Sequence, residues 1–287
     1  MPETVKAKLL LGWMTEFEAM HFLNNCEFSP PKSEDERRAL WLAYRDKVAA
    51  IGKRAIPNFG TQRLSLAEES TGKTLLNKIR KGGGANVKRV IKVSTDDLLI
   101  HQLYVITDRS DGYTSAMLDR RKRMNLCLGI GMDNKIPIGP AVRDGVWLKK
   151  RVPHGEFVPF SLGGKVVMNG PDDFLVQEQG RFISFTEFDR KLLLWAGYHR
   201  SHALVSQTKP EDTDRLLVGT LVTDGEAFLG AGSDLPDKRD IVRGDCPPLF
   251  SDFFDARFCM TVNYLKMRCE VHCNPLTGQY RIPMIPV

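Results

Sequence analysis

The spacing of hydrophobic and polar residues predicts two helices within the first fifty residues of the chain. Thr15 and Ser33 are each followed three residues later by a glutamate, which is the capping-box sequence of a helix N-terminus. Apolar residues follow both at helical spacing, and two prolines separate the patterns because neither fits inside a continuing helix. We therefore expect residues 1–52 to form a helical hairpin, which offers a packing surface for a protein partner.

After residues 53–86, a predicted linker with three consecutive glycines, the pattern becomes that of short strands. The first predicted strand is VKRVIKV, followed by a short helix capped by Ser94. Later apolar runs between glycine or Asp/Pro turns are typical of strands. They lie at residues 157–160, 165–168, 174–176, 181–185, 192–195 and 216–222. Residues 265–272 alternate, with Val271 on the inner face and His272 on the outer. The chain is predicted to be α+β, with one domain over residues 87–287 that ends in a β extension.

Composition places the chain among globular proteins. It has 287 residues, of which 42% are hydrophobic, so one or two domains can each bury a core. It contains no run of about 18 apolar residues, and its N-terminal segment lacks a cleavable small-residue site. We therefore expect a soluble cytoplasmic protein with no membrane partner.

The charge balance permits an anionic partner. The formal net charge is +6, and basic residues cluster at 78–92, 120–123 and 149–151. The six cysteines are irregularly spaced. The closest pair, Cys269 and Cys273, flanks a histidine, but no second ligand pair follows at the spacing that a zinc site needs. No metal site is predicted.

The strongest chemical signal lies at residues 192–204, LLLWAGYHRSHAL. The continuous apolar run predicts a buried strand, and Gly197 lets a ligand approach the main chain. A helix then begins near Ser201, and the free N–H groups of a helix N-terminus attract anions. His199 and Arg200 add hydrogen-bond donors, and the guanidinium fork matches phosphate oxygens. The segment predicts a phosphate site.

Residues 87–225 resemble the ParB/sulfiredoxin superfamily, whose hallmark is a glycine, one or two residues, and then His-Arg at the start of an alanine-containing helix. The chain is also similar to bacterial proteins of unassigned function that share GYHR, a P-x-x-F-x-V-Q segment, here from Pro171, and a PPL-x-x-DFFD segment, here from Pro247. The resemblance implies a mixed sheet with flanking helices. It also implies five phosphate contacts: Gly197, Tyr198, His199, Arg200 and Ser201.

The chain differs from this family at residues on which the family's known reactions depend. Sulfiredoxins place a catalytic cysteine where this chain has Tyr198, and the Glu-Asn-x-x-Arg box of ParB proteins is absent downstream of Gly197. Neither sulfinic acid reduction nor a CTP switch is therefore expected. The candidates for a general base or magnesium ligand are His199, Glu187 and Asp189.

Two functional hypotheses follow. In the first, the chain binds a nucleoside triphosphate with Mg²⁺ and acts as a phosphotransferase or hydrolase. In the second, the same turn holds the backbone phosphate of DNA or RNA, as in a nuclease, and the basic clusters follow the strand. Salt dependence separates them, because contacts with a polyanion weaken steeply as salt rises.

Overall fold

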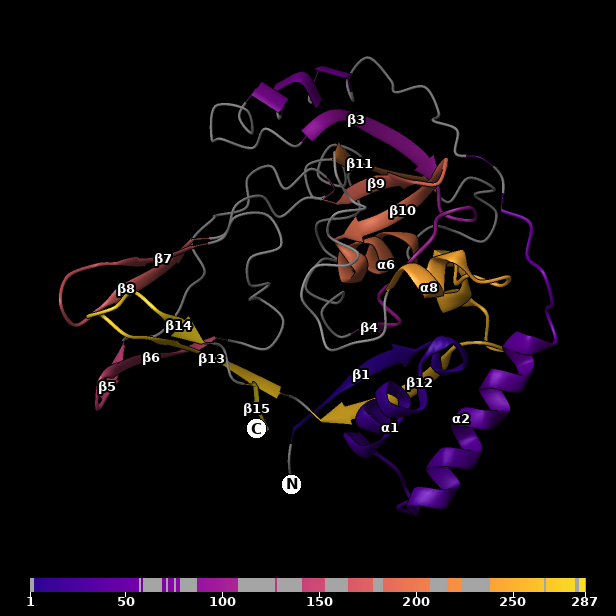
Figure 1. Cartoon of the computed structure of the whole chain (residues 1–287), viewed down its shortest axis with the longest axis horizontal. Helices are drawn as coiled ribbons and strands as arrows, with labels where there is room; N and C mark the ends of the chain where they lie inside the picture. The colour runs from indigo at the N-terminus through magenta and orange to yellow at the C-terminus, as the bar shows by residue number, and fades with distance from the viewer. Residues whose placement is uncertain are drawn as a thin grey trace. The chain divides into compact units, whose positions relative to one another are not determined.

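A computed structural model describes the greater part of the chain (Figure 1). The described residues are 3–56, 58, 69–70, 72–74, 76–77, 87–107, 127, 141–152, 165–177, 183–206, 216–222, 238–265, 267–281 and 284–286. They form a mixed α+β fold, as predicted. The chain divides into a larger unit, Val5–Ile130 with Phe182–Tyr264, and a smaller unit, Met1–Thr4 with Gly131–Arg181 and Leu265–Val287. The boundaries predicted at residues 52 and 86 do not coincide with this division.

The larger unit contains a four-stranded sheet in the order β10-β9-β11-β3. Its strands are β3 (Val87–Ser94), β9 (Ser184–Phe188), β10 (Lys191–Ala196) and β11 (Leu216–Val222). The strand β11 runs parallel to β9 and antiparallel to β3. A two-residue turn joins β9 to β10, with φ of 48° at Asp189 and 59° at Arg190. Positive φ at both positions is the geometry of a tight hairpin turn, which fixes the antiparallel register of the two strands.

The predicted sequence of strand, glycine and helix is present in this sheet. Leu192, Leu193 and Leu194 are all buried in β10, as expected for a strand covered on both faces. Only Gly197 separates β10 from helix α6 (Tyr198–Ser206), and seven of the nine residues of the helix are buried. It contacts β11 and β4 (Tyr104–Ile106), which Figure 1 shows on either side of it. The helix is therefore enclosed by the fold.

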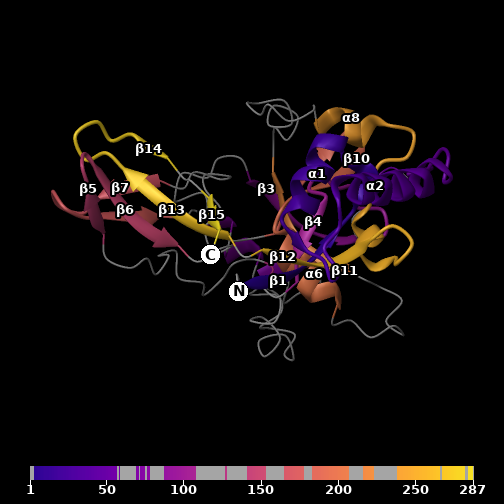
Figure 2. The same cartoon turned by 90° about the horizontal axis from the view of Figure 1, so that it is seen from below.

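The N-terminal segment forms both predicted helices and also a strand that was not predicted. Helices α1 (Glu16–Asn24) and α2 (Glu34–Ala49) begin at complete capping boxes on Thr15 and Ser33. Before them, β1 (Thr4–Leu9) pairs antiparallel with β4. It belongs to a sheet in the order β2-β12-β1-β4, with β2 (Cys26–Glu27) and β12 (Met260–Leu265). In both views α2 lies farther from this sheet than α1 does (Figures 1 and 2). The segment expected to be a separate helical hairpin over residues 1–52 thus also supplies strands to a sheet.

The larger unit also contains short helices and a bridging segment. The helices are η1 (Leu11–Trp13), α8 (Lys238–Arg243) and η3 (Phe250–Phe254). Leu99 bridges to β10, since its N–H donates to Leu192 O at 2.9 Å and its carbonyl accepts from Leu194 N at 2.8 Å. The prediction of a short helix after Ser94 is wrong. The Ser94 hydroxyl accepts instead from Asp96 N, which closes a turn.

The smaller unit is made of strands. One sheet has the order β14-β13-β6-β5, with β15 also paired to β13, and β7 and β8 form a separate pair. These strands are β5 (Val142–Asp144), β6 (Trp147–Val152), β7 (Lys165–Met168), β8 (Phe174–Gln177), β13 (Met267–Cys273), β14 (Tyr280–Arg281) and β15 (Met284–Pro286). The predicted outward position of His272 is wrong, because both Val271 and His272 are buried. The strand predicted at residues 157–160 lies outside the described residues.

Within the described part of the chain, no helix has the length and apolar character needed to cross a membrane.

Candidate functional site

Gly197 turns the chain from β10 into α6 in a way that another residue would strain. Its φ is +92°, a left-handed value that L side chains rarely adopt. A Cβ there would lie 3.1 Å from both Cα and Cγ1 of Ile183, so the glycine also permits close packing. The first helical hydrogen bond runs from Ser201 N to Gly197 O at 2.8 Å. The N–H groups of residues 198–200 therefore lie in the first turn, where a helix offers them no internal acceptor.

Tyr198, predicted as a phosphate contact, holds the fold together instead. The residue is 3% exposed, and its hydroxyl donates to Leu194 O at 2.5 Å. The same oxygen accepts from the N–H groups of His101 and Gln102 and lies 3.0 Å from His101 Nδ1. One donor and two acceptor positions are all that a phenol offers. Burial raises the pKa of Tyr198, so the group stays neutral. The tyrosine fixes residues 101 and 102 rather than a ligand.

His199 is half-buried at the start of α6, and its Nδ1 accepts a hydrogen bond from Ile106 N at 3.0 Å. An accepting Nδ1 carries no proton, so the neutral ring has its proton on Nε2. The ring centroid lies 6.1 Å from that of Tyr104. His199 is thus held in one orientation and one tautomer beside β4.

Arg200 and Ser201 lie deeper than a surface phosphate site would place them. Arg200 is 8% exposed and Ser201 is fully buried. The Ser201 hydroxyl has no hydrogen-bond partner among the described residues. The guanidinium stays charged at any physiological pH, and a buried charge acts strongly on its surroundings because water screens it less. Of the five predicted contacts, Gly197 and His199 are therefore the two that are half-exposed.

The two predicted carboxylates do not reach this turn. Glu187 is exposed and pairs with Leu192 on β10, five residues before Gly197. At about 3.3 Å per residue this separation is roughly 16 Å. Asp189 lies in the hairpin turn at the opposite end of β10 from Gly197. This corrects the prediction that either residue acts as a base or magnesium ligand at Gly197, because β10 leads away from both carboxylates before it reaches Gly197.

An open cleft of about 390 Å³ lies beside the segment that Tyr198 holds. Helix α1 forms one wall, the segment 101–104 forms another, and α8 contributes Ile241. Its lining residues are Met14, Phe17, Glu18, His21, Phe22, His101, Gln102, Leu103, Tyr104 and Ile241. The His101 ring centroid lies 5.3 Å from that of Trp195, the residue two positions before Gly197. Sequence reasoning missed this cleft because three distant segments form it.

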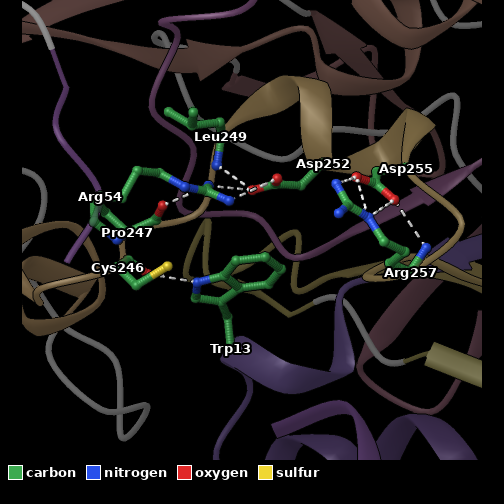
Figure 3. Close-up of polar contacts among 8 residues, drawn as sticks. All are labelled: Trp13, Arg54, Cys246, Pro247, Leu249, Asp252, Asp255 and Arg257. Carbon is green, nitrogen blue, oxygen red and sulfur yellow. Dashed lines mark hydrogen bonds and ion pairs between the residues drawn. The ribbon is translucent and has the colours of Figure 1, made fainter. Parts of the chain in front are cut away.

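A second polar cluster joins η1, residue 54 and η3 (Figure 3). Arg54 binds the Asp252 carboxylate with both terminal nitrogens, at 2.7 and 3.1 Å, and also donates to Pro247 O. Asp252 accepts in addition from Leu249 N at 2.8 Å. Trp13 packs against the guanidinium and donates to Cys246 O. The Arg54 terminal nitrogens, the Asp252 carboxylate and the Trp13 indole are thus engaged by other parts of the chain, which favours a structural role for the cluster.

The predicted basic clusters and the search for metal ligands give no further site among the described residues. Of the basic clusters, Lys88 and Arg89 are exposed on β3, Lys149 is paired with Asp144, and residues 120–123 lie outside the described residues. Where the chain is described, no three His, Cys, Asp or Glu side chains gather as metal ligands would. In comparisons with protein-family models, curated proteins and solved structures, nothing matches this chain.

Proposed function

We propose that the chain binds a nucleotide whose phosphates lie at the turn between β10 and α6. The observation that carries the proposal is the positive φ of Gly197, which leads the chain from a buried strand into the first turn of α6, where His199 and Arg200 follow. The main-chain N–H groups and the dipole of the helix favour an anion at this turn, and the positive charge of Arg200 adds to them.

In this proposal four of the five predicted residues have different roles. Gly197 and His199 are half-exposed and contact the phosphates directly, with Nε2–H of His199 as donor. Arg200 supplies positive charge from within the fold. Tyr198 holds the neighbouring segment in place. Binding is the proposed function, because among the described residues Glu187 and Asp189 lie far along β10, and His199 uses Nδ1 as an acceptor, which leaves its Nε2 protonated and not a base. The phosphates themselves would bring a bound Mg²⁺.

A thermal-shift titration with ATP, CTP and GTP, each with Mg²⁺, tests the proposal. A ligand that binds the native state raises the melting temperature. We expect at least one triphosphate to do so with the unmodified chain. Arg200→Gln should weaken binding about tenfold or more, since it removes a buried positive charge that water screens little. Arg200→Lys keeps the charge and should give an intermediate result.

Arg257→Gln is the matched control, because Arg257 is highly exposed and lies outside this turn. Circular dichroism shows whether each variant is folded. The proposal fails if no triphosphate shifts the melting temperature, or if the two glutamine variants respond alike. It also fails if a 20-mer oligonucleotide displaces the triphosphate with a steep salt dependence, which would assign the turn to a nucleic-acid backbone.

A further inference from the structure

Five of the ten residues that line the cleft carry flat rings. Phe17, Phe22 and Tyr104 contribute aromatic rings, and His21 and His101 contribute imidazoles. Its volume of about 390 Å³ lies in the usual range for small-molecule sites. Phe17 is 75% exposed, which leaves a large apolar ring open to water at the cleft. A flat apolar partner would cover it.

The rings form a continuous row from the cleft to the proposed phosphate site. The centroids of His21 and Phe22 are 5.8 Å apart, and those of Phe22 and Tyr104 are 4.8 Å apart. Tyr104 is in turn 6.1 Å from His199, in the first turn of α6. These separations are typical of packed aromatic pairs. Tyr104 therefore lies both at the cleft and beside the first turn of α6.

The polar groups of the cleft are largely used by the protein itself. Gln102 donates its side-chain N–H to Tyr104 O at 2.8 Å. The Glu18 carboxylate accepts from both N and Oγ1 of Thr15 at 2.9 Å, as part of the capping box. The cleft thus offers ring faces more than unused hydrogen-bonding edges. Stacking recognises every base because every base has a π-face, so such a cleft discriminates weakly among bases.

We infer that this cleft binds the base of the nucleotide whose phosphates lie at Gly197 and His199. The inference rests on the proposed function and extends it: the ligand is a nucleotide held by its base as well as by its phosphates, with little preference among bases. Helix α1, which belongs to the segment predicted as a separate hairpin, then forms part of the ligand site.

Isothermal titration with four probes tests the inference. The probes are ATP, CTP, tripolyphosphate and adenosine, the triphosphates and tripolyphosphate with Mg²⁺. ATP and CTP should bind within about fivefold of each other, and tripolyphosphate about tenfold or more weakly than either, since stacking of one base changes affinity by about tenfold. Adenosine should bind more weakly than ATP, because it lacks the phosphates.

Phe17→Ala is the test variant, because Phe17 is exposed on α1 and alanine is a strong helix former. It should weaken ATP binding about fivefold and leave tripolyphosphate binding unchanged. Leu42→Ala is the matched control, an exposed apolar residue on α2 that does not line the cleft. It should change neither affinity.

The outcomes separate the inference from the proposed function. If tripolyphosphate binds as tightly as ATP, or if Phe17→Ala and Leu42→Ala behave alike toward ATP, the base does not occupy the cleft and the inference alone is overturned. If adenosine binds as tightly as ATP and Arg200→Gln has no effect, the phosphate site itself is wrong. If none of the four probes binds, both statements are wrong.

Discussion

At the scale of single residues, two neighbouring ion pairs show how burial decides what a charge contributes. Asp252 and Arg54 have side chains that are 7% and 15% exposed, and the arginine binds the carboxylate with two nitrogens. Asp255 pairs with Arg257, whose side chain is 75% exposed. The hydrogen bond from Arg257 lowers the pKa of Asp255, so this pair is ionised near neutral pH. The two pairs look alike in Figure 3 but differ in their access to water.

We predict that Asp252→Asn lowers the free energy of unfolding by about 3 kcal/mol, because it leaves a buried guanidinium without its counter-charge. Asp255→Asn is the matched control and should change stability much less, since exposed pairs contribute little. Urea unfolding of both variants gives the comparison. Equal losses would mean that Arg54 regains water when its partner is removed.

At the scale of elements, the local features were predictable and the long-range ones were not. The capping boxes at Thr15 and Ser33 are confirmed because each depends on residues three positions apart. The strand β1 was missed because its hydrophobic pattern is short. It is stabilised by pairing with β4, about a hundred residues later. A short strand with a weak pattern is hard to tell from a loop when its partner is unknown.

The same distinction applies to the candidate site. The order of strand, glycine and helix at residues 191–206 could be predicted, because it is written in consecutive residues. The role of Tyr198 could not, since its hydroxyl contacts the main chain nearly a hundred positions away. The positions of Glu187 and Asp189 depend on the β9–β10 register, which brings Glu187 opposite Leu192 rather than Gly197.

The turn element itself gives a further prediction, in which Gly197→Ala is compared with Gly52→Ala. Both glycines have positive φ, +92° and +67°, but only Gly197 would place its Cβ against Ile183, since nothing lies within 4 Å of a Cβ at Gly52. Gly52→Ala should cost about 1 kcal/mol from backbone strain alone. Gly197→Ala should cost about 3 kcal/mol because overpacking is added. Urea unfolding measures both, and equal costs would show that Ile183 moves aside.

At the scale of the larger unit, a buried histidine connects three elements. His202 on α6 is 3% exposed, and its ring stacks on Phe254, with centroids 4.8 Å apart and planes 8° apart. Lys8 on β1 lies over the same phenyl ring and donates to Phe253 O. Burial, and then the charge of Lys8, lower the pKa of His202 to about 3. The fold therefore keeps this histidine neutral.

That pKa predicts how the stability of the unit depends on pH. An unfolded histidine titrates near 6.5, so between about pH 6.5 and pH 3 the unfolded chain binds a proton that the folded chain does not. Stability contributed by the neutral ring is then lost as the pH falls through this window. We expect His202 to account for roughly 2 kcal/mol of lost stability between pH 7 and pH 5.

Urea unfolding of the unmodified chain and of His202→Leu, each at pH 7 and pH 5, isolates this contribution. The leucine variant should lose less stability on acidification, because it has no proton to take up on unfolding. His21→Gln is the control, since it removes an exposed histidine instead of a buried one. If His202→Leu loses as much stability as the unmodified chain, the folded state admits the proton. In that case α6 must move away from Lys8 and Phe254 in acid, and the enclosed helix would be a mobile one.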